Sequence, residues 1–284
     1  MAIQSGNRPL EIFGYSPADN SEAAQKARTT HWCPFADRTC SKRSRLLDYP
    51  FGVCSVQHHG QYASICPKRF TEQGKLAGVP LVLEDVANHY FGSCNNVVAF
   101  SEVKLSGIGV IDFVLVHHKP MVPDVDDFVA VEFQSDSTTG TGTLVQSMRD
   151  FQSGENIQQI NYRFGMNTYD SIKRSITQLF NKGLVFESWG VKSYWIIQEY
   201  FYADLVRRYG LKVDGYLQSD SSRFALYNLV QHEDRHNLVL SRIVSASVDE
   251  IYQAMRNNPS APTKDAFVAL LNKKLRAKLR LEIG

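Results

Sequence analysis

The sequence contains no run of 18 or more apolar residues, although 43% of its 284 residues are hydrophobic. Because a helix needs about 20 apolar residues to cross a membrane, we expect no transmembrane helix and no membrane partner. The first residues, MAIQSGNRPLEIF, lack a basic start followed by an apolar run, so we expect no secretory signal and a cytoplasmic location. The apolar content is enough to bury a core, in one large domain or in one domain with a small appendage.

The net charge is also small, +2 at pH 7, and alone it indicates no particular partner. Its distribution is uneven, because residues 26–75 contain nine Lys or Arg residues and only three acidic ones. Such a local excess fits a surface that contacts phosphates, and it fits an ordinary solvated basic face equally well.

Cysteine is scarce, with five residues, and no two of them form a C-x-x-C pair, which argues against an oxidoreductase. Four of the five nevertheless lie within one short segment, at Cys33, Cys40, Cys54 and Cys66. In a reducing compartment, clustered thiols favour metal binding over disulfides, and four thiolates close a tetrahedral structural shell. Zinc is the usual ion, while iron or an iron–sulfur cluster is chemically possible. The alternative is four unrelated buried thiols.

Apolar periodicity predicts an α/β fold in which a mixed sheet is flanked by helices. The expected strands cover 96–105, 109–118, 127–135, 191–198 and 223–230. The expected helices cover 21–28, 81–91, 168–182, 199–210, 247–258 and 263–280. Asn20 or Ser21 suits the start of the first helix, and Gly183 suits the end of the 168–182 helix. We expect residues 1–19 to form an irregular arm and residues 31–70 a loop-rich module organised by metal rather than by its own core.

Three polar side chains interrupt the apolar strands. Asp112 lies within IDFVLV, and Glu132 and Gln134 lie two apart within VEFQ, so that the latter two share one face of a strand. Two buried acids that converge repel each other unless a cation lies between them, and Mg²⁺ prefers such oxygen ligands. The alternative is that both acids sit at exposed strand ends beside Lys or Arg. Glu102, or Glu84 on the preceding helix, is a candidate third carboxylate.

These blocks together resemble one known family. The cysteine segment contains HWCPF at 31–35, CSK at 40–42, GVCS at 52–55 and ICPKRF at 65–70. The later segment contains VIDFVLV, VAVEFQS, GMNTYDSIKRSITQLFNKG and VKSYWIIQ. From about residue 31 to 200 the chain resembles the NotI family of type II restriction endonucleases. Residues 205–284 carry no motif that we can match.

The resemblance implies a PD-(D/E)xK nuclease core with a four-cysteine iron-binding module, zinc being the alternative metal. The active-site residues of the family match Asp112, Glu132 and Gln134, with Glu102 as the added candidate, and Mg²⁺ would be held by Asp112 and Glu132. The metal cysteines match Cys33, Cys40, Cys54 and Cys66. We therefore divide the chain into residues 1–75, an N-terminal arm and four-cysteine DNA-contact module, and residues 76–284, a nuclease core with C-terminal helices.

The implied function is a staggered double-strand cut in a GC-rich palindrome by a homodimer, with a partner DNA methyltransferase in the same restriction–modification system. Arg and Lys are the usual readers of guanine in the major groove. The candidate DNA-binding residues are Lys42, Arg43, Arg45, Arg149, Arg163, Lys173 and Arg174. Two other functions stay open from the residues alone: a non-catalytic DNA-binding protein built around the cysteine site, and an iron–sulfur exonuclease.

Overall fold

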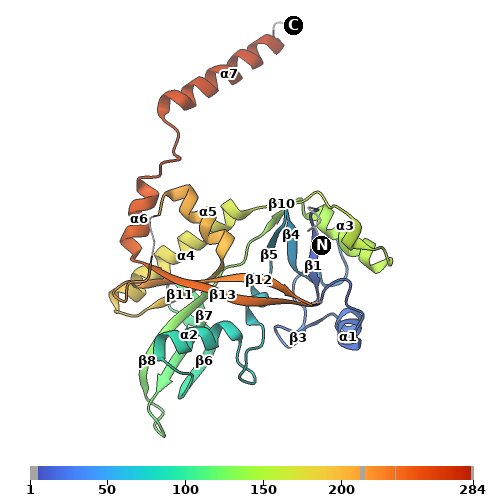
Figure 1. Ribbon diagram of the computed structural model, residues 1–284. Helices are drawn as coiled ribbons and strands as arrows, with labels where there is room; N and C mark the ends of the chain where they lie inside the picture. Colours follow the sequence, from blue (N-terminus) through green and yellow to red (C-terminus); the bar gives the residue numbers. More distant parts are fainter. Residues whose placement is uncertain (1–5, 212–214, 234, 283–284) are drawn as a thin grey trace.

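A mixed six-stranded sheet forms the centre of the molecule. The computed structural model describes residues 6–211, 215–233 and 235–282. The sheet has the order β13-β12-β11-β8-β7-β6 (Figure 1). Its strands are β6 (Val97–Leu105), β7 (Gly109–His118), β8 (Val125–Phe133), β11 (Ser193–Gln198), β12 (Ser222–His232) and β13 (Arg235–Ala246). Strand β11 runs parallel to both β8 and β12, and the other neighbours are antiparallel. The expected α/β class is therefore confirmed.

Helices cover both faces of this sheet. On one face, α4 (Thr168–Ser188), α5 (Glu199–Tyr209) and α6 (Val248–Arg256) pack over Trp195 and Ile197. On the other, α2 (Leu81–Phe91) packs over Tyr194 and Ile196. Because successive side chains of a strand point to opposite faces, the apolar run of β11 fills both cores.

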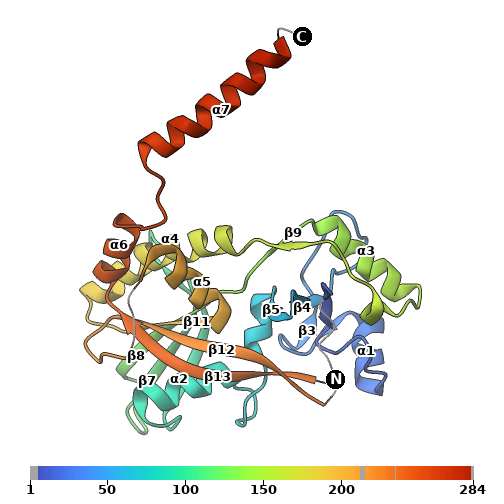
Figure 2. The same cartoon turned by 45° about the horizontal axis from the view of Figure 1, so that its top comes forward.

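A second, three-stranded sheet has the order β1-β4-β5. Its strands are β1 (Arg8–Ile12), β4 (Val53–His58) and β5 (Gln61–Ser64), and α1 (Glu22–Thr30) and α3 (Thr141–Gln152) lie beside it (Figure 2). The core of this lobe joins Val53, Val56 and Ile65 to Leu144 and Met148 of α3. The expectation of an irregular arm and a module without its own core was wrong, because this sheet buries an apolar face against a helix from much later in the chain.

Short elements complete the chain. They are β2 (Trp32–Cys33), β3 (Arg38–Thr39), β9 (Thr138–Thr139), β10 (Gly165–Met166) and the two 3₁₀ turns η1 (Pro67–Thr71) and η2 (Ile157–Gln159). Strand β2 pairs with β3 in the cysteine segment, and β9 pairs with β10.

Most helix boundaries agree with the sequence. Ser21 caps α1 by accepting the Ala24 N–H, as expected. Helix α4 differs, because it continues through Gly183 to Ser188. Gly183 is buried, and a Cβ there would lie 3.2 Å from Val248. This glycine therefore permits close packing of α4 against α6 and does not end the helix.

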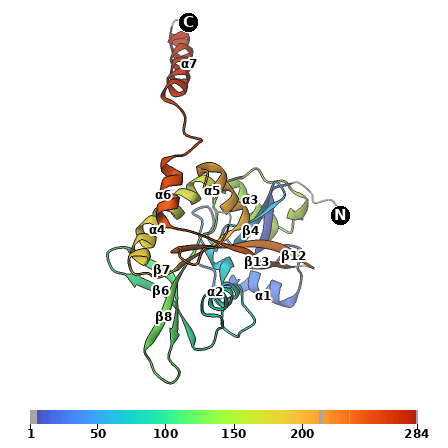
Figure 3. The same ribbon diagram turned by 60° about the vertical axis from the view of Figure 1, so that its left-hand side comes forward.

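The last helix, α7 (Lys264–Glu282), stands away from the rest of the chain (Figures 1 and 3). Its described side chains are all exposed, among them Phe267, Leu271 and Leu275. Within the described residues, no helix combines the length and the hydropathy that a membrane span requires.

Candidate active site

The two predicted carboxylates, Asp112 and Glu132, lie where strands β7 and β8 separate, a place that we call the fork. The antiparallel pairing of these strands runs from His118↔Val125 to Phe113↔Val131, and Asp112 and Glu132 come next on either side. Beyond this point β8 stays paired with β11 through Phe133. The Asp112 carboxylate accepts the Phe133 N–H at 2.8 Å. The fork thus brings the two acids together, as the sequence predicts.

Burial dominates the chemistry of Glu132. The side chain is only 2% exposed, and desolvation raises the pKa of its carboxyl from 4.5 to about 7. The hydrogen bond from Lys182 opposes this rise in pKa, whereas the nearby charge of Asp112 adds to it. The two carboxylates are therefore close enough to feel each other, which is the arrangement that a divalent cation relieves.

Lys182 completes the fork from the middle of α4. Its Nζ donates to Glu132 Oε1 and to the Val110 carbonyl oxygen, each at 2.6 Å. Lys182 is not among the site residues expected from the sequence. It follows Leu179 by three residues, so helical spacing places it on the buried face and could have revealed it.

Gln134 lies just after the end of β8. Its backbone N–H donates to the Ile196 carbonyl, and its side-chain amide donates to the Ser135 carbonyl at 2.7 Å. Since the strand ends at Phe133, the simple alternation that would align Gln134 with Glu132 no longer holds. Gln134 is near the fork in sequence, but its amide points to its own backbone.

The two candidates for a third carboxylate, Glu102 and Glu84, lie in different surroundings. Glu102 is exposed with a positive φ of 55°, between the β6–β7 pairs Ser101↔Phe113 and Val103↔Ile111. It therefore lies opposite Asp112 in the register. Glu84 instead accepts the Leu76 N–H at 2.5 Å. Among the described residues, no hydrogen bond or ion pair joins either acid to Asp112 or Glu132.

A second buried acid, Asp136, lies four residues after Glu132 and was not predicted. It is 4% exposed, and its carboxylate accepts hydrogen bonds from Thr168 at 2.6 Å and from the Tyr200 hydroxyl at 3.1 Å. Burial raises its pKa, and these hydrogen bonds oppose the rise. Asp136 thus ties the segment after β8 to the start of α4 and to α5.

The next residues of this segment carry hydroxyl groups beside predicted DNA-binding side chains. Ser137 lies 2.9 Å from Ser171, oxygen to oxygen, and Arg174 donates to both hydroxyls. Exposed Lys173, on the same helix, is paired with Asp170 and lies over the Tyr169 ring.

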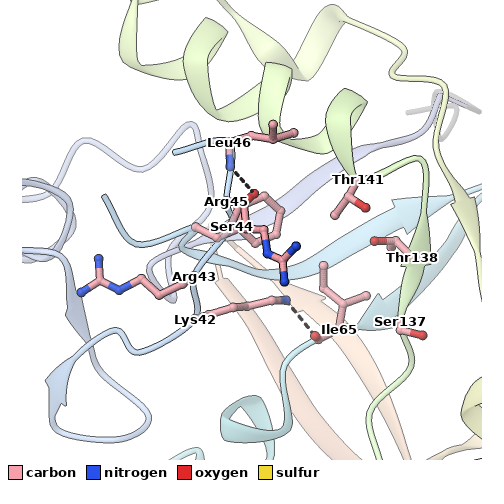
Figure 4. Close-up of a pocket in the computed structure, with 10 residues that line it drawn as sticks. Lys42, Arg43, Ser44, Arg45, Leu46, Ile65, Ser137, Thr138 and Thr141 are labelled. Atoms are coloured by element: carbon pink, nitrogen blue, oxygen red, sulfur yellow. Dashed lines mark hydrogen bonds between the residues drawn. The ribbon is translucent and has the colours of Figure 1, made fainter. Parts of the chain in front are cut away.

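A basic pocket of about 460 Å³ lies between the cysteine segment and the start of α3. Arg43 and Arg45 lie on one side, and Ser137, Thr138 and Thr141 on the other (Figure 4). Lys42 also lines this pocket, but its amine turns inward to donate to the Ile65 carbonyl at 2.8 Å and to Val53 at 3.3 Å. Burial lowers the pKa of Lys42. The predicted cluster of Lys42, Arg43 and Arg45 therefore divides into one structural and two exposed side chains.

Two further predicted DNA-binding residues lie on the α3 side of the molecule. Arg149 is on α3 and donates to the Leu46 carbonyl at 2.8 Å. It therefore fixes the backbone directly after Arg45. Arg163 is exposed next to the buried Phe164. Both therefore border the same lobe as the pocket.

The four cysteines are near one another without forming a coordination shell. Cys33, Cys40 and Cys66 line one pocket of about 250 Å³, and Cys54 is buried close by. Burial raises the pKa of the Cys33 and Cys54 thiols, and the charge of Cys66 raises both further. In the part of the chain that the structure describes, no three His, Cys, Asp or Glu side chains are placed to hold a metal ion. The donor chemistry suits a thiophilic ion, but the arrangement does not show one.

The donors at the fork suit a different ion. Asp112 and Glu132 offer oxygen atoms only, which hard cations such as Mg²⁺ prefer. They form a pair rather than a group of three, and Mg²⁺ commonly takes one or two protein carboxylates and completes its shell with water and substrate oxygens. These residues therefore fit a magnesium ion that binds together with DNA.

The fork lies in a part of the chain that matches a known protein family. The model of the family "Restriction endonuclease NotI" matches residues 17–215, which is more than half of the chain. The chain belongs to the NotI family of restriction endonucleases. None of the curated proteins compared with it matches.

Membership of the NotI family makes the protein a type II restriction endonuclease, an enzyme that cuts double-stranded DNA at specific sites. The matched region contains the fork, the cysteine segment and the basic pocket. It ends shortly after α5, so the β12–β13 hairpin, α6 and α7 lie outside it.

Proposed function

We propose that this NotI-family enzyme makes Mg²⁺-dependent, staggered double-strand cuts in GC-rich palindromic DNA, with its active site at the β7–β8 fork. One observation carries the location: Asp112 and Glu132 meet where the two strands separate, and Glu132 is buried with a pKa near 7. A buried acid beside a second carboxylate is costly for stability alone and useful for binding a cation.

Asp112 and Glu132 would hold the magnesium ion. When bound, Mg²⁺ offsets charge on the scissile phosphate and lowers the pKa of the attacking water. The chain itself orients the ligands, since the Phe133 N–H fixes Asp112 and the Lys182 amine fixes Glu132. Gln134 carries no charge and cannot act as a base, so its part is to orient water by hydrogen bonding. Glu102 would join the carboxylates only if the β6 backbone brought it inward.

The DNA backbone would follow the segment that leads away from the fork. Arg174 and the Ser137 and Ser171 hydroxyls come first, and the pocket with Arg43 and Arg45 follows. Guanidinium and hydroxyl groups are common phosphate contacts, and Arg is also the usual reader of guanine. Arg149, Arg163 and Lys173 are proposed as further contacts on the flanks, and Lys42 as a support for the pocket floor.

A palindromic target has a two-fold axis, so a C2 homodimer would place one fork on each strand of the DNA. A methyltransferase of the same system would protect host DNA by modifying the same site, without direct contact with this protein. The division into residues 1–75 and 76–284 remains our proposal, with α3 of the second part completing the core of the first.

The cysteines would hold one structural metal ion, iron by resemblance and zinc as the alternative. The proposal is supported by the shared pocket and by the neighbouring thiols, which add to the raised pKa of Cys33 and of Cys54. Metal analysis of the purified protein tests it. One iron or zinc per chain that is lost in Cys54→Ser supports the site, whereas metal-free protein with full activity contradicts it.

Digestion of a long, unmethylated, GC-rich DNA of known sequence tests the function. We expect a discrete ladder with Mg²⁺ and none with EDTA, and sequencing of the ends should give a palindrome and a stagger. Cutting without Mg²⁺, blunt ends or random ends would each contradict the corresponding part of the proposal.

A further inference from the structure

Lys182 is a buried lysine in the interior of a helix, which is an uncommon place for an ammonium group. It is 6% exposed, while the neighbouring face of α4 consists mostly of apolar or small residues such as Leu179, Gly183 and Phe186. Lysine is almost never buried unless it is paired. Its position therefore calls for a partner, and the fork supplies one.

The ammonium bridges both strands of the fork. Val110 belongs to β7, two residues before Asp112, and Glu132 belongs to β8. Lys182 Nζ bonds to both at 2.6 Å. An ammonium has three N–H donors, so two are used here and one is left for a group that arrives at the fork.

Stability alone does not explain this pair. Removing two charges from water costs several kcal/mol, and well-packed apolar residues often stabilise such positions equally well or better. The ion pair is formed at the fork, by the Glu132 carboxylate that also feels the charge of Asp112, rather than elsewhere in the core. The nearby Gln134 contributes no positive charge, so Lys182 is the cation that contacts Glu132 among the described residues.

Building on the active site proposed above, we infer that Lys182 is a positioning residue of the cleavage reaction. It holds the Glu132 carboxylate in the orientation that receives the metal. It also supplies a fixed positive charge at the fork, which the uncharged side chain of Gln134 cannot do. The charge comes from α4, 50 residues along the chain from Glu132. A fixed cation near the scissile phosphate stabilises negative charge that develops in the transition state.

The test separates cleavage from DNA binding. The variants are Lys182→Met, which removes the charge, and Lys182→Arg, which restores it. Lys192→Met is the control, because the Lys192 amine donates to the Ser219 carbonyl at a partly exposed site away from the fork carboxylates. Lys182→Gln is the fall-back neutral variant, since its amide can still donate to Val110 if Lys182→Met does not fold. Single-turnover cleavage is measured at saturating Mg²⁺, and DNA affinity is measured in Ca²⁺.

We expect Lys182→Met, or Lys182→Gln in its place, to lower the cleavage rate of bound DNA by about a hundredfold or more, the usual size for loss of one preorganised charge contact. DNA affinity should change by less than about threefold, and Lys182→Arg should recover at least about tenfold in rate. A neutral variant that cuts at the wild-type rate overturns the inference. So does an arginine variant no better than the neutral one when both are equally folded.

Failure of the inference differs from failure of the proposed active site. If Asp112→Asn is inactive while the neutral Lys182 variant cuts normally, the fork is the active site and Lys182 is only structural. If Asp112→Asn cuts like the wild type, the proposed site is wrong and the inference falls with it.

Discussion

At the fork, some side chains are placed to bind a metal ion, and others fix the orientation of those ligands. Glu132 has a raised pKa because it is buried, and Asp112 adds to that rise. Lys182 and the Phe133 N–H satisfy one oxygen of each acid. Mg²⁺ commonly binds a protein through one or two carboxylates, so this pair is enough for a magnesium site.

Gln134→Ala tests the role of the glutamine. In the described part of the chain the side-chain amide hydrogen bonds to the Ser135 carbonyl alone, so the change should leave the fold intact. If the amide orients the attacking water, cleavage of bound DNA should slow by about tenfold to a hundredfold while DNA affinity in Ca²⁺ stays the same. Single-turnover rates beside a binding titration check this. An equal loss of rate and affinity would mean that Gln134 serves DNA binding instead.

His236 makes stability depend on pH. The residue is buried, and neither ring nitrogen has a hydrogen-bond partner among the residues that the structure describes. Burial, followed by the charge of Arg69, lowers the pKa of the imidazole to about 4. A lowered pKa means that the neutral ring contributes stability above its unfolded value of about 6.5, and that this stability is lost as pH falls toward 4.

His236→Phe should therefore flatten the acid side of the stability curve. Between pH 7 and pH 4 the wild type should lose about 3 kcal/mol more in free energy of unfolding than the variant does. Urea unfolding at both pH values measures the difference. His232→Phe, at an exposed position on β12, is the control and should follow the wild type. Parallel curves for wild type and His236→Phe would contradict the assignment.

At the scale of elements, one buried arginine ties the small lobe to the main sheet. Arg69 in η1 pairs with Glu11 of β1 at 2.8 Å and with Glu72 at 2.6 Å, and it also donates to the His236 carbonyl of β13. Its guanidinium lies over the Phe35 ring of the cysteine segment. Four segments of the chain thus meet at one side chain.

Arg69→Met should be strongly destabilising, because it leaves the 2%-exposed Glu11 buried without its cation. The expected loss is about 3–5 kcal/mol in free energy of unfolding. The matched control is Arg242→Met, which breaks the exposed pair with Glu199 and should cost about 1 kcal/mol or less. Denaturant unfolding of both variants measures these two changes. Similar losses in free energy of unfolding would contradict the role of Arg69 in joining the small lobe to the main sheet.

Elements with a strong apolar period were predictable, and elements set by context were not. The period identified β7, β8, β11 and the start of α4, and with them the positions of Asp112 and Glu132. Strand β1 was missed because Pro9 suggests a break, although it lies at an irregular pairing on an edge strand, where proline is tolerated. Strand β13 was missed because polar residues such as Arg235 and Arg242 interrupt its apolar pattern.

The missing half of the candidate site came from long-range packing. Lys182 reaches Glu132 because α4 packs against the sheet, and the sequence places these two residues 50 positions apart. Asp136 likewise depends on Thr168 and Tyr200 from two helices. Local patterns do not encode such contacts.

For the molecule as a whole, helix α7 does not contribute to the hydrophobic core of the described residues. Helix α7 exposes Phe267, Leu271 and Leu275, whereas α6 still packs into the core through Val248 and Ile251. A chain that ends at Ala261 should therefore keep the melting temperature of the full chain within about 2 °C, because no buried area is lost. Thermal unfolding of the two chains tests this. A clear drop for the shorter chain would mean that α7 packs against something in solution.

The central claim is that Asp112 belongs to the active site of a NotI-family nuclease, and the most direct measurement compares wild type with Asp112→Asn on the same GC-rich DNA with Mg²⁺. Asparagine can still accept the Phe133 N–H through its amide oxygen, so the fold should survive while the charge is lost. We predict a discrete ladder from the wild type, none from the variant, and similar DNA affinity in Ca²⁺. The same ladder from both proteins would contradict the account.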